Sequence, residues 1–88
     1  MTFTKKPSQP GFGTWYVGKE EFDTEHDLVA WIKVMDKPSE TYGIDGGRII
    51  KLTIQIGKEY IAVYERGWDT PVPEEAQPLY ESILAQFN

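Results

Sequence analysis

The side chains that could carry out chemistry in this chain are few and scattered. The 88 residues include one histidine and no cysteine, which excludes disulfides, zinc-thiolate centres and thiol nucleophiles. His26 stands among carboxylates that run from Glu20 to Asp27. Carboxylates that alternate along a strand point to opposite faces and do not converge on one ion. We therefore expect a solvated acidic turn, with a weak divalent site as the less favoured alternative, and neither a metal centre nor a cofactor.

The residues that could act in nucleophilic catalysis are present, but their positions do not form a catalytic arrangement. A serine nucleophile needs a base beside it, but Ser8, Ser39 and Ser82 are spread over an N-terminal arm, a polar loop and the polar side of a C-terminal helix. Paired-carboxylate chemistry needs a deep cleft, which a single domain of this size rarely offers. We expect no catalytic residues and no enzymatic activity.

A glycine-rich turn is the second feature that could bind a ligand. It comprises Asp45, Gly46, Gly47 and Arg48. Glycines here favour positive φ and a tight turn, and successive backbone amides can also cradle an anion. The segment lacks the spacing and the Lys-Ser/Thr pair of a P-loop, and a strand follows it. We favour a structural role, in which the glycines allow a tight turn. A small-ligand or nucleotide site is the less favoured alternative.

The elements that position these residues follow from hydrophobic periodicity. Alternating segments 14–22 and 27–37 predict one β-hairpin, and segments 48–56 and 59–66 predict another. The second hairpin has a two-residue turn, Gly57-Lys58, with glycine first as a type II′ turn prefers. Four antiparallel strands in a meander are therefore expected.

The register of the first hairpin decides which aromatic side chains share a face. A four-residue loop pairs Phe22 with Asp27. This pairing puts Trp15 on the apolar face and Trp31 on the other face, opposite Gly18.

The second hairpin is expected to form an unbroken ladder from its turn. Ile54 then pairs with Ile61, and Leu52 with Val63. The expected apolar face consists of Ile50, Leu52, Ile54, Ile61 and Val63. The expected opposite face consists of Lys51, Thr53, Gln55, Tyr60, Ala62, Tyr64 and Arg66.

The C-terminal segment of the sequence has the periodicity of an amphipathic helix. Apolar residues from Ala76 to Phe87 recur at helical spacing and predict a helix that begins at Glu74 or Glu75. Pro78 fits only in or near its first turn, and Trp68 is expected to plug the junction between sheet and helix. The fold class is α+β: a four-stranded antiparallel meander sheet with one C-terminal helix packed on one face. Residues 14–88 form this single ββββα domain, and residues 1–13 are expected to be a flexible N-terminal arm.

The sheet face that the helix leaves uncovered is the main candidate binding surface. Aromatic and basic side chains on a sheet can stack nucleobases, anchor a protein partner or be buried in a homodimer. A solvated face, or one covered by the arm, is the remaining alternative. The net charge of −5 opposes binding to phosphate backbones, so we favour a protein partner or homodimer over nucleic acid, and a small ligand stays open. The candidate residues are Tyr16, Trp31, Lys33, Lys51, Tyr60, Tyr64 and Arg66.

Two motifs suggest a biological context. The turn Tyr42-Gly43-Ile44-Asp45-Gly46-Gly47-Arg48, the corner Arg66-Gly67-Trp68-Asp69 and the closing helix resemble a group of small uncharacterised phage and prophage proteins of Gram-positive bacteria. The resemblance implies a phage accessory context and carries no activity, cofactor or catalytic residue. We expect a small non-enzymatic accessory protein that binds a protein partner. An acidic inhibitor of a host defence enzyme is a narrower version of this expectation. A small-ligand or nucleotide-binding module and a self-associating structural protein are the alternatives.

The same sequence offers no sign of membrane insertion or export. It contains no apolar run of roughly 18 residues, the length that reads as a membrane span, and no apolar segment follows Lys5 and Lys6 as in a secretory signal. We therefore expect a cytoplasmic protein without a membrane partner.

Overall fold

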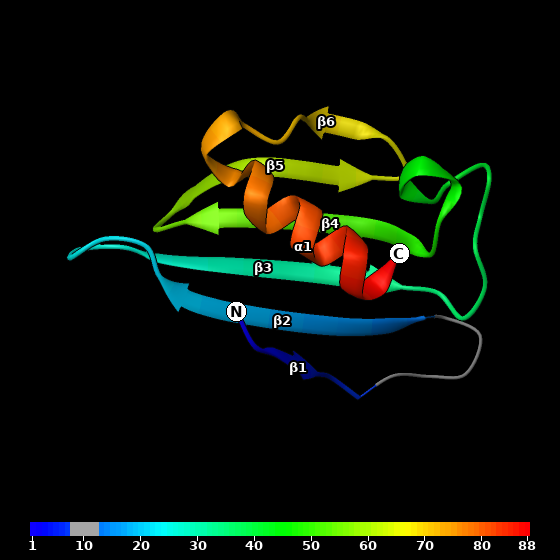
Figure 1. Ribbon diagram of the computed structural model, residues 1–88, viewed down its shortest axis with the longest axis horizontal. Helices are drawn as coiled ribbons and strands as arrows, with labels where there is room; N and C mark the ends of the chain where they lie inside the picture. The colour runs from blue at the N-terminus through cyan, green and yellow to red at the C-terminus, as the bar shows by residue number, and fades with distance from the viewer. Residues whose placement is uncertain (8–12) are drawn as a thin grey trace.

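The computed structural model describes residues 1–7 and 13–88, which fold as one antiparallel sheet with a helix across one face (Figure 1). The strands follow one another in chain order. They are β1 (Phe3–Lys5), β2 (Thr14–Glu21), β3 (Asp27–Val34), β4 (Ile49–Ile56), β5 (Glu59–Glu65) and β6 (Trp68–Thr70). The helix is α1 (Gln77–Phe87), and two short 3-10 turns are η1 (Ile44–Gly46) and η2 (Glu74–Ala76). The predicted α+β class and the meander with a C-terminal helix are confirmed.

The predicted number of four strands is wrong, because a short strand is added at each edge of the sheet. Residues Phe3–Lys5, which we expected in a flexible arm, pair with β2 as strand β1. The Phe3 ring packs edge-on against Phe87 of α1, with 5.1 Å between ring centroids, and this contact holds the strand in place. The part of the expected arm at residues 8–12 lies outside the described residues. At the other edge, β6 pairs with β5.

The predicted register of the first hairpin is wrong by one residue. Glu21, rather than Phe22, pairs with Asp27. The loop is longer because the Asp23 carboxylate accepts hydrogen bonds from the backbone amides of Glu25 and His26, at 2.8 and 2.7 Å. A one-residue slip turns every side chain of a strand to the opposite face.

Trp15 and Tyr16 exchange places as a result of this slip. Tyr16 pairs with Ile32 and lies beneath α1, where its ring is 4.7 Å from that of Phe87. Trp15 pairs with Lys33 on the face away from the helix. Our expectations that Tyr16 lies on the uncovered face and that Trp31 lies opposite Gly18 are both incorrect.

A β-bulge at Ile61 breaks the expected ladder of the second hairpin. The Gly57-Lys58 turn is confirmed, with Ile56 opposite Glu59 and Gly57 at a φ of 59°. Beyond Tyr60 the register shifts, so that Ala62 pairs with Ile54. A bulge inserts one residue and reverses the alternation that follows it.

The side chains of β5 beyond this bulge therefore face the opposite way from our prediction. Ala62 and Tyr64 are buried under the helix, and Tyr64 donates a hydrogen bond from its hydroxyl to the Tyr42 carbonyl at 2.9 Å. Val63 lies on the other face, opposite Thr53. Tyr64 is thus a core residue and not a residue of the uncovered face.

A second irregularity lies at the start of β4. Val34 pairs with Ile49, whereas the adjacent Lys33 pairs with Lys51, so Ile50 falls between the two pairs. Ile49 is fully buried and takes the core position that we assigned to Ile50.

The core lies between the sheet and α1. Its largest fully buried side chains are Ile32, Ile44, Ile49, Leu52, Ile54 and Ile83. The helix begins at Gln77, after the turn η2, and Pro78 lies in its first turn as predicted. Trp68 packs between Tyr64 and Tyr80, at centroid distances of 5.0 and 5.6 Å, but it stays 41% exposed.

The glycine-rich turn holds the C-terminal end of α1. Arg48 donates from Nε and Nη2 to the Phe87 carbonyl, at 3.2 and 3.0 Å. Asn88 Oδ1 accepts from the Ile49 amide at 3.0 Å, and its Nδ2 donates to the Ile44 carbonyl at 2.9 Å. A Cβ atom on Gly47 would collide with the Asn88 side chain, which explains the need for glycine here. The turn therefore satisfies the carbonyl of Phe87 at the end of the helix, and the Asn88 side chain joins the end of the chain to the turn.

We predict that Asn88→Ala destabilises the protein by about 1–3 kcal/mol, because it leaves a backbone amide and a carbonyl without their partners in a partly buried region. Urea unfolding monitored by tryptophan fluorescence measures this change. Glu81→Ala, at an exposed position of the same helix, is the control and should stay within about 0.5 kcal/mol of wild type. An unchanged urea midpoint for Asn88→Ala would show that the hydrogen bonds of Asn88 to Ile49 and Ile44 do not stabilise the fold.

Candidate functional site

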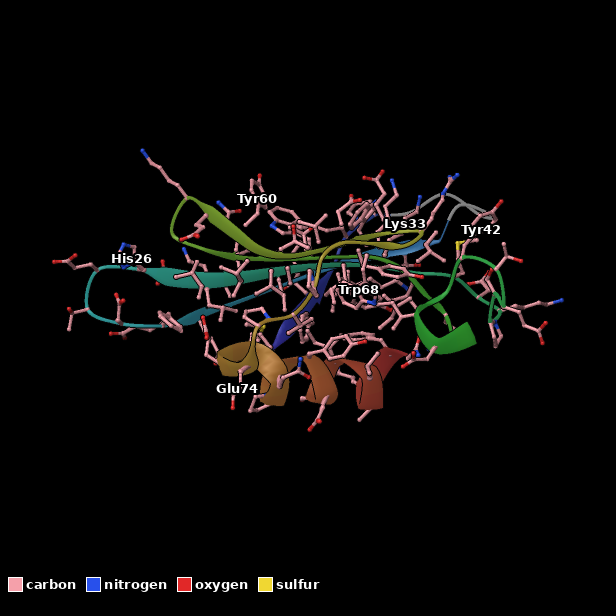
Figure 2. All side chains as sticks on the ribbon, turned by 90° about the horizontal axis from the view of Figure 1, so that it is seen from above. His26, Lys33, Tyr42, Tyr60, Trp68 and Glu74 are labelled. Carbon is pink, nitrogen blue, oxygen red and sulfur yellow. The ribbon has the colours of Figure 1, made fainter. Side chains whose placement is uncertain are left out.

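The sheet face opposite α1 is uncovered in the described part of the chain (Figure 2). We call this surface the open face. Figure 2 shows Tyr60 and Lys33 on this side of the sheet and Glu74 on the side of the helix. Its central side chains are Trp15, Trp31, Lys33, Lys51, Thr53, Gln55 and Tyr60. The face combines large aromatic rings with amino and amide groups.

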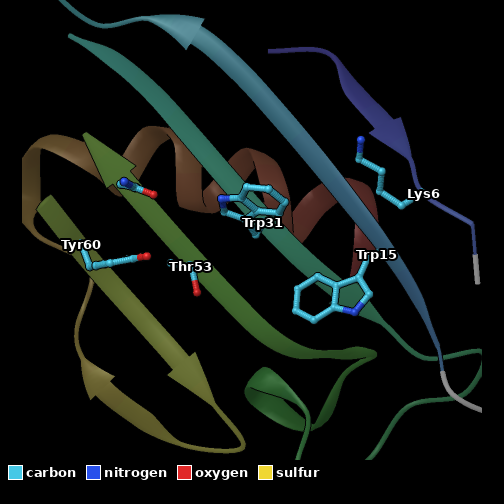
Figure 3. A pocket seen from close by; sticks show the side chains of 6 residues that line it. Lys6, Trp15, Trp31, Thr53 and Tyr60 are labelled. Carbon is cyan, nitrogen blue, oxygen red and sulfur yellow. The ribbon is translucent and has the colours of Figure 1, made fainter. Parts of the chain in front are cut away.

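A shallow groove of about 600 Å³ runs across the open face (Figure 3). We call it the aromatic groove. It is lined by Lys6, Trp15, Trp31, Thr53, Gln55 and Tyr60. Trp31 is 40% exposed and Tyr60 is 60% exposed, so ring surface is available to a ligand. Such large exposed apolar side chains gathered in one place are typical of an interaction site.

A row of four paired residues crosses the open face beside this groove. Trp15 pairs with Lys33, Lys33 with Lys51, and Lys51 with Glu65. The Lys33 ammonium lies 5.9 Å from the centre of the Trp15 ring, and Lys51 forms an ion pair with Glu65 at 3.2 Å. Two lysines directly opposite each other on neighbouring strands destabilise a sheet. The row holds two lysines and one glutamate, so it has an excess of positive charge at its centre.

A second groove, of about 540 Å³, lies at the loop end of this row. We call it the loop groove, and it is lined by Met35, Asp36, Lys37, Pro38, Ser39, Tyr42, Ile50 and Arg66. The Arg66 guanidinium lies 5.4 Å from the centre of the Tyr42 ring, and Arg66 has a φ of 60°. Ile50 directly precedes Lys51 and Arg66 directly follows Glu65, so the loop groove adjoins the row of lysines.

The structure brings together four of the seven residues that we predicted for this face. Trp31, Lys33, Lys51 and Tyr60 lie on the open face, and Arg66 lies at its end in the loop groove. Tyr16 and Tyr64 do not, because the register slip and the bulge turn them toward α1.

Sequence reasoning missed Trp15 and Lys6 as residues of the site. The Trp15 error follows from the loop length, and the signal that could have corrected it is Asp23, a residue type that bonds to backbone amides two and three positions ahead. Lys6 was missed because a three-residue strand has too little periodicity to recognise. The Lys6 amide donates to the Trp15 carbonyl at 2.8 Å, which holds it beside the groove.

The weaker site hypothesis placed an anion at the Asp45–Arg48 turn. The amides of Gly46 and Gly47 donate to the carbonyls of Gly43 and Ile44, at 3.1 and 2.9 Å, and Arg48 donates to Phe87. The donors that would cradle an anion are thus used inside the fold. The geometry favours the structural interpretation of this turn.

The acidic hairpin loop is ordered by hydrogen bonds. His26 Nδ1 lies 3.0 and 3.1 Å from the two carboxylate oxygens of Asp23. The pKa of the Asp23 carboxyl lies below its ordinary value of 3.8, first because the Glu25 amide donates to it and then because of His26. Among residues 1–7 and 13–88, no group of three or more His, Cys, Asp or Glu side chains could hold a metal ion.

Comparison with known proteins connects the chain to one family. The model of a family described as "Domain of unknown function (DUF7678)" matches residues 14–88. The chain belongs to this family. No curated protein and no solved structure matches it. The DUF7678 match spans β2 to α1 and contains Trp15, Trp31, Lys33 and Tyr60, whereas β1 and Lys6 precede it.

Within the described residues, none of the helices has the length and apolar character that a membrane-spanning helix requires.

We predict that the Asp23 carboxyl titrates below 3.8 in the folded protein, the ordinary value given above. Because folding lowers this pKa, the interaction stabilises the hairpin at higher pH and is lost as pH falls through the folded-state pKa. An NMR titration of the Asp23 carboxyl carbon measures it. His26→Ala should move the midpoint only part of the way back, since the Glu25 amide remains. A wild-type midpoint at or above the ordinary value would show that these hydrogen bonds do not form in solution.

Proposed function

We propose that this protein is a non-enzymatic binding protein that holds its partner on the open face. The observation that carries this proposal is the exposure of Trp31 and Tyr60 beside Trp15 in one groove. An aromatic side chain buries about 150–250 Å² when it is fully enclosed, and a partner can cover the exposed 40% of Trp31 and 60% of Tyr60. Aromatic side chains in such positions are the residues that dominate binding energy at interfaces.

The construction of the groove also supports a binding role. Its three rings stand on β2, β3 and β5, whose backbones are fixed by the sheet. Rigid aromatic side chains lose little conformational entropy on binding. Thr53 and Gln55 add hydrogen-bonding groups between the rings, so the groove can orient a partner as well as attract it.

The phage-type accessory role is a proposal based on the resemblance of the two motifs and not on the groove. Inhibition of a host enzyme is a narrower version of it. Its structural support is the exposed acidic hairpin loop, in which Glu20, Glu21, Asp23, Glu25 and Asp27 are all solvent-exposed. Reversal of these charges should abolish inhibition if the loop mimics an acidic substrate, and unchanged inhibition would contradict the mimicry.

Native mass spectrometry of the protein purified gently from its own cells tests the binding role. We expect a retained partner that is lost from the Trp31→Ala/Tyr60→Ala double variant. Phe22→Ala is the matched control, because Phe22 is an aromatic residue, 47% exposed, that lies outside the groove. It should keep the partner.

Two results would contradict the proposal. One is a wild-type protein that carries no partner under these conditions. The other is a double variant that keeps the same partner as wild type, since binding would then occur elsewhere. A partner that is a second copy of the chain would identify the function as self-association through the open face.

A further inference from the structure

We propose that the occupant of the open face is a single-stranded nucleic acid, with bases stacked in the aromatic groove and phosphates along the lysine row. This inference rests on the proposed binding function and names its partner. Base stacking on sheet aromatics together with a basic backbone track is the physical basis of single-strand binding. The arrangement of rings and the distribution of charge each support it.

The three rings form a diagonal path across the sheet. Tyr60 pairs with Gln55, Trp31 with Thr53, and Trp15 with Lys33, so each ring stands in the next cross-strand row along the sheet. Strand spacing and rise place the Cα atoms of neighbouring ring residues about 12 and 8 Å apart. Each ring is therefore far enough from the next to take a different base.

The charges of the chain are segregated in favour of this path. Five of the nine basic residues line the two grooves or lie in the row between them. They are Lys6, Lys33, Lys37, Lys51 and Arg66. Two carboxylates, Asp36 and Glu65, share this region, which leaves a local charge of +3 in a chain of net −5. The overall charge that argued against phosphate contacts thus belongs to the rest of the chain.

The opposition of Lys33 and Lys51 points to an anionic partner in particular. Like charges in directly paired positions weaken a sheet, and Glu65 offsets only one of the two lysines. A phosphate above the pair would relieve this repulsion. The same pair opposes self-association, because a two-fold dimer would bring this patch against an identical patch.

The loop groove extends the path beyond the lysine row. Arg66 lies over the Tyr42 ring at 5.4 Å and offers both a planar cation and a neighbouring aromatic surface. Arg66 also has left-handed backbone geometry, which is costly for a residue with a side chain and is concentrated at functional sites. These two side chains lie at the Glu65 end of the lysine row, opposite the end held by Trp15.

Fluorescence anisotropy with a labelled 12-nucleotide single strand tests the proposal. The Trp31→Ala/Tyr60→Ala variant should bind at least tenfold more weakly, because each stacked base contributes substantially to affinity. Phe22→Ala should bind like wild type. Circular dichroism and thermal unfolding establish that each variant is folded before its affinity is compared.

The lysine row is tested through the salt dependence of binding. Lys33→Gln/Lys51→Gln should reduce the slope of log affinity against log salt by about 1.4, since each phosphate contact to a single strand contributes about 0.7. Lys58→Gln is the control, because Lys58 lies in the β4–β5 turn and lines neither groove. Its slope should be unchanged.

Four results would overturn this inference. The first two are an affinity for a duplex of the same length, or for a mononucleotide, that equals the affinity for the single strand. The third is an oligonucleotide affinity that is unchanged in the Trp31→Ala/Tyr60→Ala variant. The fourth is no oligonucleotide binding at all. If no oligonucleotide binds while native mass spectrometry still finds a protein whose retention needs Trp31 and Tyr60, the binding function stands and its partner is a protein.

Discussion

One helix can cover only one face of this sheet, and the rest of the structure depends on that constraint. Five isoleucine and leucine side chains of β3 and β4 are buried because α1 lies over them: Leu28, Ile32, Ile49, Leu52 and Ile54. The helix stays there through its C-terminal end, where the Phe87 ring contacts Phe3 and Tyr16 and Arg48 and Asn88 bond it to the loop before β4. Everything on the opposite face is left to solvent or to a partner, because the described chain has no second layer to place there.

The two grooves and the lysine row show how an acidic protein can present a basic surface. Net charge describes solubility and long-range attraction, whereas contact with a partner depends on the charges within a Debye length of the site, about 8–10 Å in physiological salt. The exposed carboxylates of the β2–β3 loop and of α1 lie on other parts of the molecule. This separation is why we propose a nucleic-acid partner for a chain whose net charge is negative.

Irregular points in the sheet select the residues of the open face. The Asx-type turn at Asp23 and the bulges at Ile50 and Ile61 each change the register by one residue. The turn at Asp23 directs Trp15 outward and Tyr16 toward the helix. The bulge at Ile61 directs Tyr64 toward the helix, and the bulge at Ile50 places Ile49 in the core. Bulges commonly redirect side chains near functional sites. In this sheet the irregular points direct Tyr16 and Tyr64 away from the open face and place Trp15 in the aromatic groove.

The sequence by itself determined the features that depend on local patterns. These are the main strands, the Gly57-Lys58 turn, the helix with Pro78 in its first turn, and the outward direction of Trp31, Lys33, Lys51 and Tyr60. Only the tertiary structure decided the edge strands, because β1 and β6 have three residues each and are held by contacts with distant elements such as Phe87. It also decided which of Trp15 and Tyr16 faces out and where Tyr64 points. The physical reason is the two-residue period of a strand: one extra loop or bulge residue reverses every side chain beyond it, and alternation alone does not reveal where that residue is inserted.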